Sequence, residues 1–225
     1  LALLSIFIIL FITPTPEKQS FHRDTQLSIG DISKVLADRE LLRLDLGVFV
    51  LHMVLAATFV LFPLILRDQL QIEVLQHWKT YLSVFIISIV IMVPMIIVAE
   101  KKRKMKPMFL VGILVVGLAE VGLYLFNGYV PMFIMLVLFF AGFNFLEASM
   151  PSLVAKISPA DMKGTAMGLF SSAQFLGAFA GGLLGGVMLA YESQNLAFLQ
   201  LAVLVMIWWI VAFFMKKPKA VTSRI

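Results

Sequence analysis

The sequence predicts an all-α membrane protein, a bundle of six transmembrane helices preceded by the end of another helix. Three observations predict this fold class. Of the 225 residues, 61% are hydrophobic and only 14% are charged, whereas about a quarter of the residues in soluble domains are charged. Six apolar segments are long enough to cross roughly 30 Å of hydrocarbon at about 1.5 Å per residue. The lysines and arginines gather in alternate connections between these segments, as they do in membrane proteins.

The first twelve residues, LALLSIFIILFI, form an apolar stretch that is too short to span a bilayer. No basic region precedes this stretch, as a secretory signal would require. We therefore expect residues 1–12 to be the end of a truncated transmembrane helix. Residues 13–43 follow as a central linker, in which DISKVLADRELLRL places apolar residues at helical spacing behind a possible N-cap at Asp31. This pattern predicts an amphipathic helix on the membrane surface.

The six-helix bundle is expected between residues 44 and 215, followed by a tail at 216–225. Each apolar segment should be a helix, because a helix satisfies its own backbone hydrogen bonds inside the hydrocarbon. The predicted spans cover residues 44–66, 80–99, 108–126, 130–150, 165–190 and 196–215.

The distribution of basic residues predicts the orientation of these spans. The linker, the connections 100–107 and 151–164 and the tail together contain sixteen lysines and arginines, and the other three connections contain two. This asymmetry places the linker and the C-terminus in the cytoplasm. The net charge of +5 is then a signal of topology and lipid contact, and no nucleic-acid partner is expected. Cysteine is absent, which excludes disulfides, thiolate metal sites and cysteine nucleophiles.

One long stretch resembles a known family. FNFLEASMPSLVAKISPADMKGTAMGLFSSAQFLGAFAGGLLGG resembles the tenth and eleventh helices of major facilitator superfamily transporters. Together with QHWKTYL and VPMIIVAEKKRKMKPMF, it is similar to the YajR-type bacterial inner-membrane transporters. The resemblance covers essentially the whole chain after residue 40. It implies that the six spans are helices seven to twelve of a twelve-helix fold, with a first six-helix half as their partner, in a secondary transporter of the bacterial inner membrane.

Three polar side chains on different spans are predicted to share one depth in the membrane. At the helical rise, His52, Asn144 and Gln174 lie about 12, 9 and 15 Å from the cytoplasmic ends of their helices. The resemblance implies that these helices face a central cavity at least in part, so these three residues are candidates for contact with substrate. The alternative is that Asn144 and Gln174 only hold helices together by hydrogen bonds. His52 can change its charge near neutral pH, which suits proton coupling.

Two glutamates also lie within the apolar spans. Glu120 lies about 18 Å into the ninth helix of the family fold, which is peripheral there, so a structural role is expected. Glu147 lies about one turn from the cytoplasmic end of its predicted span, close to snorkelling depth. Its position suggests a contact with the charged connection that follows the second span.

That connection, AEKKRKMKP, resembles the family's loop motif of an acid followed by a basic cluster. The resemblance assigns Glu100 to the acidic position and Lys101 and Lys104 to the basic positions, while Arg103 stands where the motif usually carries glycine. Asp161 is expected in the first turn of the next-to-last helix, where the helix dipole favours an anion. We therefore predict a charge latch that holds helix ends together in one state of the transporter. Its members are Glu100, Lys101, Lys104, Glu147 and Asp161. The alternative is a solvated basic loop.

Glycines at a spacing of four, Gly177, Gly181 and Gly185, predict a close approach between two helices. The function expected from all these features is alternating-access transport of a small molecule, with proton-coupled efflux as the form that the resemblance implies. Alternatives are a nutrient or metabolite uniporter or symporter, an integral membrane enzyme, and a membrane scaffold. The enzyme is disfavoured because the sequence has no catalytic or cofactor motif and no cluster of metal ligands. The expected partners are a small-molecule substrate, protons and membrane lipid.

Overall fold

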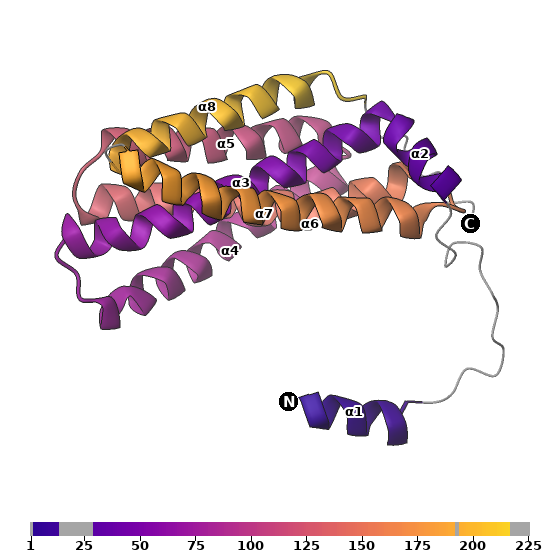
Figure 1. Cartoon of the computed structure of the whole chain (residues 1–225), viewed down its shortest axis with the longest axis horizontal. Coiled ribbons are helices and arrows are strands. Elements are labelled where there is room, and N and C mark those ends of the chain that lie inside the picture. The colour runs from indigo at the N-terminus through magenta and orange to yellow at the C-terminus, as the bar shows by residue number, and fades with distance from the viewer. Residues whose placement is uncertain (1, 14–28, 192–193, 217–225) are drawn as a thin grey trace.

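The computed structural model describes residues 2–13, 29–191 and 194–216, and these form helices without any strand. Figure 1 shows α1 (Ala2–Phe11), α2 (Ile29–Ala37), α3 (Arg39–Asp68), the short 3-10 helix η2 (Val74–Gln76), α4 (His77–Lys101), α5 (Met105–Leu125), α6 (Tyr129–Ile157), α7 (Lys163–Tyr191) and α8 (Gln194–Phe213). Six helices in this part of the chain, α3 to α8, are long and apolar enough to cross a membrane. The predicted fold class is confirmed.

The boundary between linker and bundle differs from the prediction. The amphipathic helix α2 ends at Ala37, and α3 already begins at Arg39, so residues 39–43 belong to the first long helix. The reason is the N-cap at Asp38, whose carboxylate accepts hydrogen bonds from the backbone N–H groups of Glu40 (2.8 Å) and Leu41 (3.3 Å). Asp31, the predicted cap, lies inside the first turn of α2. Residues 14–28 of the predicted linker and 217–225 of the predicted tail lie outside the described residues.

Helix α6 is longer than its predicted span. It continues through Pro151 and ends at Ile157, whereas the sequence prediction ends the span at Met150. Proline has no N–H group, so Pro151 leaves the carbonyl of Glu147, one turn earlier, without its usual helical donor. The helix nevertheless continues. Glu147 therefore lies ten residues, or about 15 Å, from the helix end instead of one turn.

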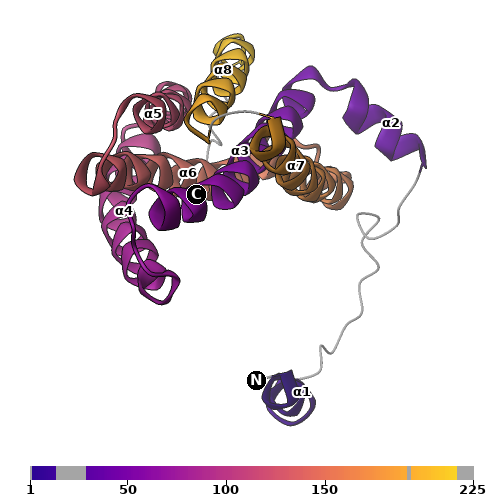
Figure 2. The ribbon, with the colours of Figure 1, turned by 60° about the vertical axis from the view of Figure 1, so that its left-hand side comes forward.

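The long helices pack in pairs. Helix α3 lies along α7, α5 lies between α6 and α8, and α4 lies along α6, as Figures 1 and 2 show. The core between them is formed by large apolar side chains of α3, α5, α6 and α8, such as Phe62, Phe109, Phe145 and Trp208. More than half of the apolar stretch of α3 is buried, but only 17% of that of α4 and 22% of that of α7. Helices α4 and α7 thus present open apolar faces.

Side-chain contacts tie the helix ends together at both ends of the bundle. At the basic end, the Lys156 ammonium donates to the Glu100 carboxylate (3.0 Å), and Glu40 accepts from the backbone N–H of Lys216 (3.0 Å). At the opposite end, the Gln69 amide donates to the Asn195 side chain (3.2 Å). The basic connections of the described chain therefore gather at one end of the bundle, and a hydrogen bond between amide side chains links the helices at the other end.

The contact between α3 and α7 depends on glycine. A Cβ atom added to Gly177 would lie 2.2 Å from the carbonyl oxygen of Phe49, and one added to Gly181 would lie 2.1 Å from that of Met53. Gly185 is also close, since its Cβ would lie 3.1 Å from the Cα of Ala57. A Cβ atom does not fit about 2 Å from a carbonyl oxygen, so the backbones touch at Gly177 and Gly181 only because these residues are glycines, whereas a Cβ atom at Gly185 would need only a small shift of its neighbours.

The turn after α4 has a left-handed residue at Arg103, whose φ is 51°. The N–H of Lys104 donates to the carbonyl of Ala99 (3.0 Å), and the N–H of Arg103 donates to that of Glu100 (3.2 Å). This pair of bonds is the Schellman ending of a helix, whose left-handed position is usually glycine. The described turn forms with arginine at this position, whose φ is left-handed.

Candidate functional site

A polar contact between helices α3 and α7 forms the centre of the site. The side-chain amide nitrogen of Gln174 lies 2.9 Å from Nε2 of His52. The glycines of α7 bring Gln174 to this place, because Gly177 lies one turn further along α7 and holds it against α3. Two of the three residues predicted to share one depth thus meet directly.

Glu147 of α6 completes the cluster. Its Oε1 accepts a hydrogen bond from the Gln174 amide (3.1 Å), and its Oε2 lies 3.6 Å from Nε2 of His52. Three helices therefore supply one residue each, and we call His52, Glu147 and Gln174 the polar triad. The His52 side chain is 11% exposed and that of Glu147 is 35% exposed. The triad is partly open to the space beside the bundle.

One assignment of protons satisfies the described contacts. Nδ1 of His52 lies 3.1 Å from the carbonyl of Val48 and donates to it as an N–H group. Nε2 then accepts one proton of the Gln174 amide, and the other amide proton is donated to Glu147. The second oxygen of Glu147 has no hydrogen-bond donor among the described residues. The arrangement can therefore take up one more proton, on Nε2 or on this oxygen.

Aromatic rings cover one side of the triad. The ring of Phe143 meets His52 edge to face, with centroids 5.6 Å apart, and Phe139 and Phe140 pack against Phe143. Phe143 and Glu147 are one turn apart on α6, so one face of that helix supplies both an acid and an apolar wall. Phe139 and Phe143 are buried and Phe140 is partly exposed, so the apolar wall beside the triad is mainly part of the core.

Asn144, the third predicted cavity residue, is not part of the triad. Its amide donates to the hydroxyl of Ser88 on α4 (3.1 Å), and Ser88 itself donates to the carbonyl of Phe85 (2.8 Å). This contact joins α6 to α4 and corresponds to the alternative prediction, a hydrogen bond between helices.

Glu120 lies in a separate, closed environment. It is fully buried, and its Oε1 lies 3.0 Å from the hydroxyl of Thr58 on α3. Its other oxygen has no partner among the described residues. The expected structural role fits this position between α5 and α3.

The residues of the predicted charge latch do not form one group. The described ion-pair partner of Glu100 is Lys156, while the described polar contacts of Glu147 are with the triad. Lys101 and Lys104 are exposed on the connection after α4. Asp161 precedes α7 in a turn closed by the N–H of Met162 and the carbonyl of Pro159 (3.1 Å), because α7 begins only at Lys163.

Sequence reasoning missed two hydroxyl partners of polar residues and the place of Glu147 in the triad. Thr58 and Ser88 are hydroxyl side chains inside apolar helices, and each bonds a polar residue of another helix. Their position within apolar runs is the signal that could have found them, since hydroxyl groups inside a membrane need partners. The position of Glu147 in the triad was hidden by Pro151, which suggests the end of a helix although α6 continues through it.

Comparisons with known proteins fit this geometry. The profile of the Major Facilitator Superfamily matches residues 44–224. The chain is 39% identical, over 99% of its length and 49% of the relative's, to the inner membrane transport protein YajR of Escherichia coli. It is 27% identical to an uncharacterized transporter of Buchnera aphidicola, over 84% of the chain and 50% of the relative. With the multidrug resistance protein MdtH of Aeromonas salmonicida the identity is 26%, over 80% of the chain and 45% of the relative.

These matches confirm the resemblance that the sequence motifs indicated. The chain spans about half the length of the curated relatives that it matches. Six helices of the described chain are long and apolar enough to cross a membrane, and the most extensively matched of these relatives is named as an inner membrane transport protein.

Proposed function

The chain belongs to the Major Facilitator Superfamily, and from this premise we propose that it forms one six-helix half of a secondary transporter that couples movement of a small molecule to movement of protons. The observation that carries the proposal is the polar triad, in which His52, Glu147 and Gln174 meet from three helices. An imidazole beside a carboxylate can hold or release a proton near neutral pH.

The proton changes the contacts within the triad. Without an added proton, Gln174 bridges His52 and Glu147. A proton on Nε2 of His52 turns that atom from an acceptor into a donor, so the Gln174 amide can no longer donate to it. The positively charged ring then attracts Glu147 across a gap of 3.6 Å. Protonation thereby changes how α3, α6 and α7 are tied together, which is the link that alternating access needs.

The substrate proposed is a small amphipathic molecule moved out of the cell. The ring of Phe143 contacts His52, and the partly exposed ring of Phe140 packs against Phe143, so an apolar group adjoins the polar triad. A multidrug resistance protein among the relatives is consistent with this class of substrate and with efflux. The excess of basic residues supports a cytoplasmic position for the end of the bundle that contains Glu100 and Lys156.

A smaller role is proposed for the Glu100–Lys156 pair as a contact that opens and closes with the cytoplasmic ends of α4 and α6. The two side chains are 49% and 34% exposed, so the pair contributes at most about 1 kcal/mol. A weak contact of this kind can break in each cycle without a large barrier.

The test is flux in proteoliposomes that contain the complete transport unit. A pH gradient is imposed, a panel of amphipathic dyes is added, and dye movement and internal pH are recorded together. We expect dye flux that depends on the gradient and carries protons, and we expect His52→Gln to remove this dependence. Flux that ignores the gradient would instead identify a uniporter, and an absence of flux for every solute, nutrients included, would favour a scaffold.

A further inference from the structure

The connection between α5 and α6 contains an asparagine followed by a glycine, Asn127 and Gly128. The chain has three asparagines, and the other two precede larger residues, since Asn144 is followed by phenylalanine and Asn195 by leucine. Asn127 lies outside both helices, and its side chain is exposed. A connection between two spans lies at the membrane surface, where water has access to it.

Asparagine followed by glycine has a chemistry of its own. The backbone nitrogen of the second residue can attack the side-chain carbonyl carbon of the asparagine, because the two atoms belong to one chain and close a five-membered ring. Glycine favours the attack, since it has no Cβ beside the nitrogen and its dihedral angles are free. A helix prevents the attack, because there the backbone N–H is hydrogen-bonded and the dihedral angles are fixed.

The backbone nitrogen of Gly128 is available for this reaction. Its N–H has no acceptor among the residues that the structure describes, whereas its carbonyl accepts from the N–H of Met132 (3.3 Å). The φ of Gly128 is 98°, and a Cβ atom added there would meet only Pro131, at 4.0 Å. The nitrogen can therefore approach the side chain of Asn127 without first breaking a hydrogen bond. Asn144, by contrast, lies inside α6.

A positioned amide group lies at the carbonyl that is attacked. The Asn195 amide nitrogen lies 3.5 Å from Oδ1 of Asn127 and donates to it, and the Gln69 amide donates to the oxygen of Asn195 (3.2 Å). Gln69 thereby fixes the orientation of the Asn195 amide, with its nitrogen toward Asn127. When the backbone nitrogen attacks, Oδ1 gains negative charge, and a donor already in place stabilises that charge.

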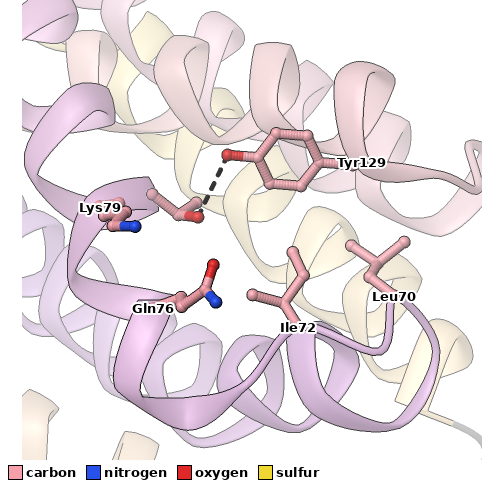
Figure 3. A pocket seen from close by; sticks show the side chains of 6 residues that line it. Leu70, Ile72, Gln76, Lys79 and Tyr129 are labelled. Carbon is pink, nitrogen blue, oxygen red and sulfur yellow. Dashed lines mark hydrogen bonds between the residues drawn. The ribbon is translucent and has the colours of Figure 1, made fainter.

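Both neighbours of the pair are held by hydrogen bonds. The N–H of Phe126 closes the last turn of α5 (2.9 Å). On the other side, Figure 3 shows the pocket in which the hydroxyl of Tyr129 lies 3.2 Å from that of Thr80. A change in backbone length between Phe126 and Tyr129 must therefore be taken up within the pair itself, where it would displace the side chain of Asn127.

We propose that Asn127 is a site of self-modification, which the backbone nitrogen of Gly128 converts through a succinimide to aspartate and isoaspartate. The nitrogen forms a bond to Cγ of Asn127, and the side-chain nitrogen leaves as ammonia with the proton that the backbone nitrogen loses. Water then opens the ring at either carbonyl. Overall one water is consumed and one ammonia is released, and no other reactant takes part.

The products change this end of the bundle. Both replace a neutral amide by a carboxylate, and isoaspartate also inserts a CH2 group into the backbone, which moves the side group away from Asn195. The link from Asn127 through Asn195 to Gln69 is then lost. The site is independent of the transport proposed for the polar triad, whose residues lie on α3, α6 and α7.

The experiment follows the purified complete transport unit during incubation in detergent micelles, in mildly acidic and in mildly alkaline buffer. Peptides are analysed by mass spectrometry for the replacement of NH2 by OH, with electron-transfer fragmentation to separate isoaspartate from aspartate. Asn195 is the internal control, because its side-chain oxygen also accepts from an amide but leucine follows it. A synthetic FNGYV peptide gives the time scale. Circular dichroism checks that the variants keep their helices.

We expect Asn127 to convert at least about tenfold faster than Asn195 in alkaline buffer. Conversion should be slower in acid, because the attacking nitrogen must lose its proton, and both isoaspartate and aspartate should form. Gly128→Ala should slow conversion at least about tenfold, since it places a Cβ beside the nitrogen. Asn195→Ala should slow it about threefold, through loss of the donor to Oδ1.

Four results would overturn the proposal. The first is equal conversion of Asn127 and Asn195, and the second is aspartate as the sole product, which would indicate direct hydrolysis by water. The third is an unchanged rate in Gly128→Ala. The fourth is an intact Asn127 after the synthetic peptide has reacted completely. An unchanged rate in Asn195→Ala would refute the assistance by Asn195.

Discussion

Two glutamates lie inside the apolar helices of this protein, and their surroundings differ. Glu147 is 35% exposed and contacts side chains of two other helices, His52 and Gln174. Glu120 is fully buried and contacts the single hydroxyl of Thr58. The flanking sequences, NFLEASM and GLAEVGL, are similarly apolar. The two acids thus differ in their partners and in the exposure of their side chains, and from this difference we predict that transport depends on Glu147 and not on Glu120.

The contacts of Glu120 also indicate how a closed acid is tolerated. The Thr58 hydroxyl has one proton and lies near two acceptors, the carbonyl of Val54 (2.8 Å) and the Glu120 carboxyl (3.0 Å). If the carboxyl is neutral and donates from Oε1 to Thr58 while Thr58 donates to Val54, each of these two contacts has its own proton, and Oε2 of Glu120 remains without a partner among the described residues. An isolated ionised carboxylate at this place would be very costly. Glu120 thus serves as a hydrogen-bonded link between α5 and α3.

The largest effect is expected from Glu147→Gln. Glutamine keeps the shape of the side chain but cannot hold an exchangeable proton, so gradient-driven flux in proteoliposomes should fall at least about tenfold. Glu120→Gln is the matched control, because it makes the same change in the closed environment, and its flux should stay within about twofold of the parent. Equal losses in both variants would mean that the two acids are functionally alike.

Stability should show the opposite ranking. Glu120→Ala leaves a cavity in the core and removes a partner of Thr58, which should lower the free energy of unfolding by about 3 kcal/mol. Glu147→Ala removes a partly exposed side chain and should cost about 1 kcal/mol. Titration with sodium dodecyl sulfate, followed by circular dichroism in micelles, measures both. A larger loss for Glu147→Ala would reverse the assignment of structural and functional acid.

The contact between α3 and α7, which positions the triad, can be tested by replacing two neighbouring glycines of α7. Gly181→Ala places a methyl carbon 2.1 Å from the carbonyl oxygen of Met53. This overlap should lower the free energy of unfolding by about 2 kcal/mol. It should also move Gln174 away from His52 and weaken flux. Gly182→Ala is the control, since no atom lies within 4 Å of its added Cβ. That variant should raise the free energy of unfolding by about 0.5–1 kcal/mol, because alanine favours a helix interior more than glycine does.

The smallest effect is expected outside both glutamate sites, at Arg103. Its φ of 51° is left-handed, a conformation that costs most residues about 1 kcal/mol but glycine almost nothing. Arg103→Gly should therefore raise the free energy of unfolding by up to about 1 kcal/mol, although glycine gains more freedom in the unfolded chain. Lys102→Gly, at a position with negative φ, should destabilise instead. The same detergent titration resolves the two signs.

Much of the fold could be predicted from local sequence. Six apolar runs gave six long helices, and the close approach at Gly177, Gly181 and Gly185 was expected from their spacing. The prediction erred at helix ends, because capping at Asp38 and continuation through Pro151 depend on local geometry that composition does not contain. For the site, depth along the helices brought His52 and Gln174 to one level, but depth cannot say which way a side chain points. Asn144 therefore met Ser88, whereas Glu147 joined the triad.

The sequence by itself determined that the described part of this chain contains six helices long and apolar enough to cross a membrane, and that its cations lie at alternate connections. Both follow from the free energy of transferring side chains between water and hydrocarbon, which depends on composition and length alone. Only the tertiary structure decided that Glu147 meets His52 and Gln174 while Glu120 is enclosed with Thr58. These contacts depend on the rotation of each helix about its axis, and packing against neighbouring helices sets that rotation.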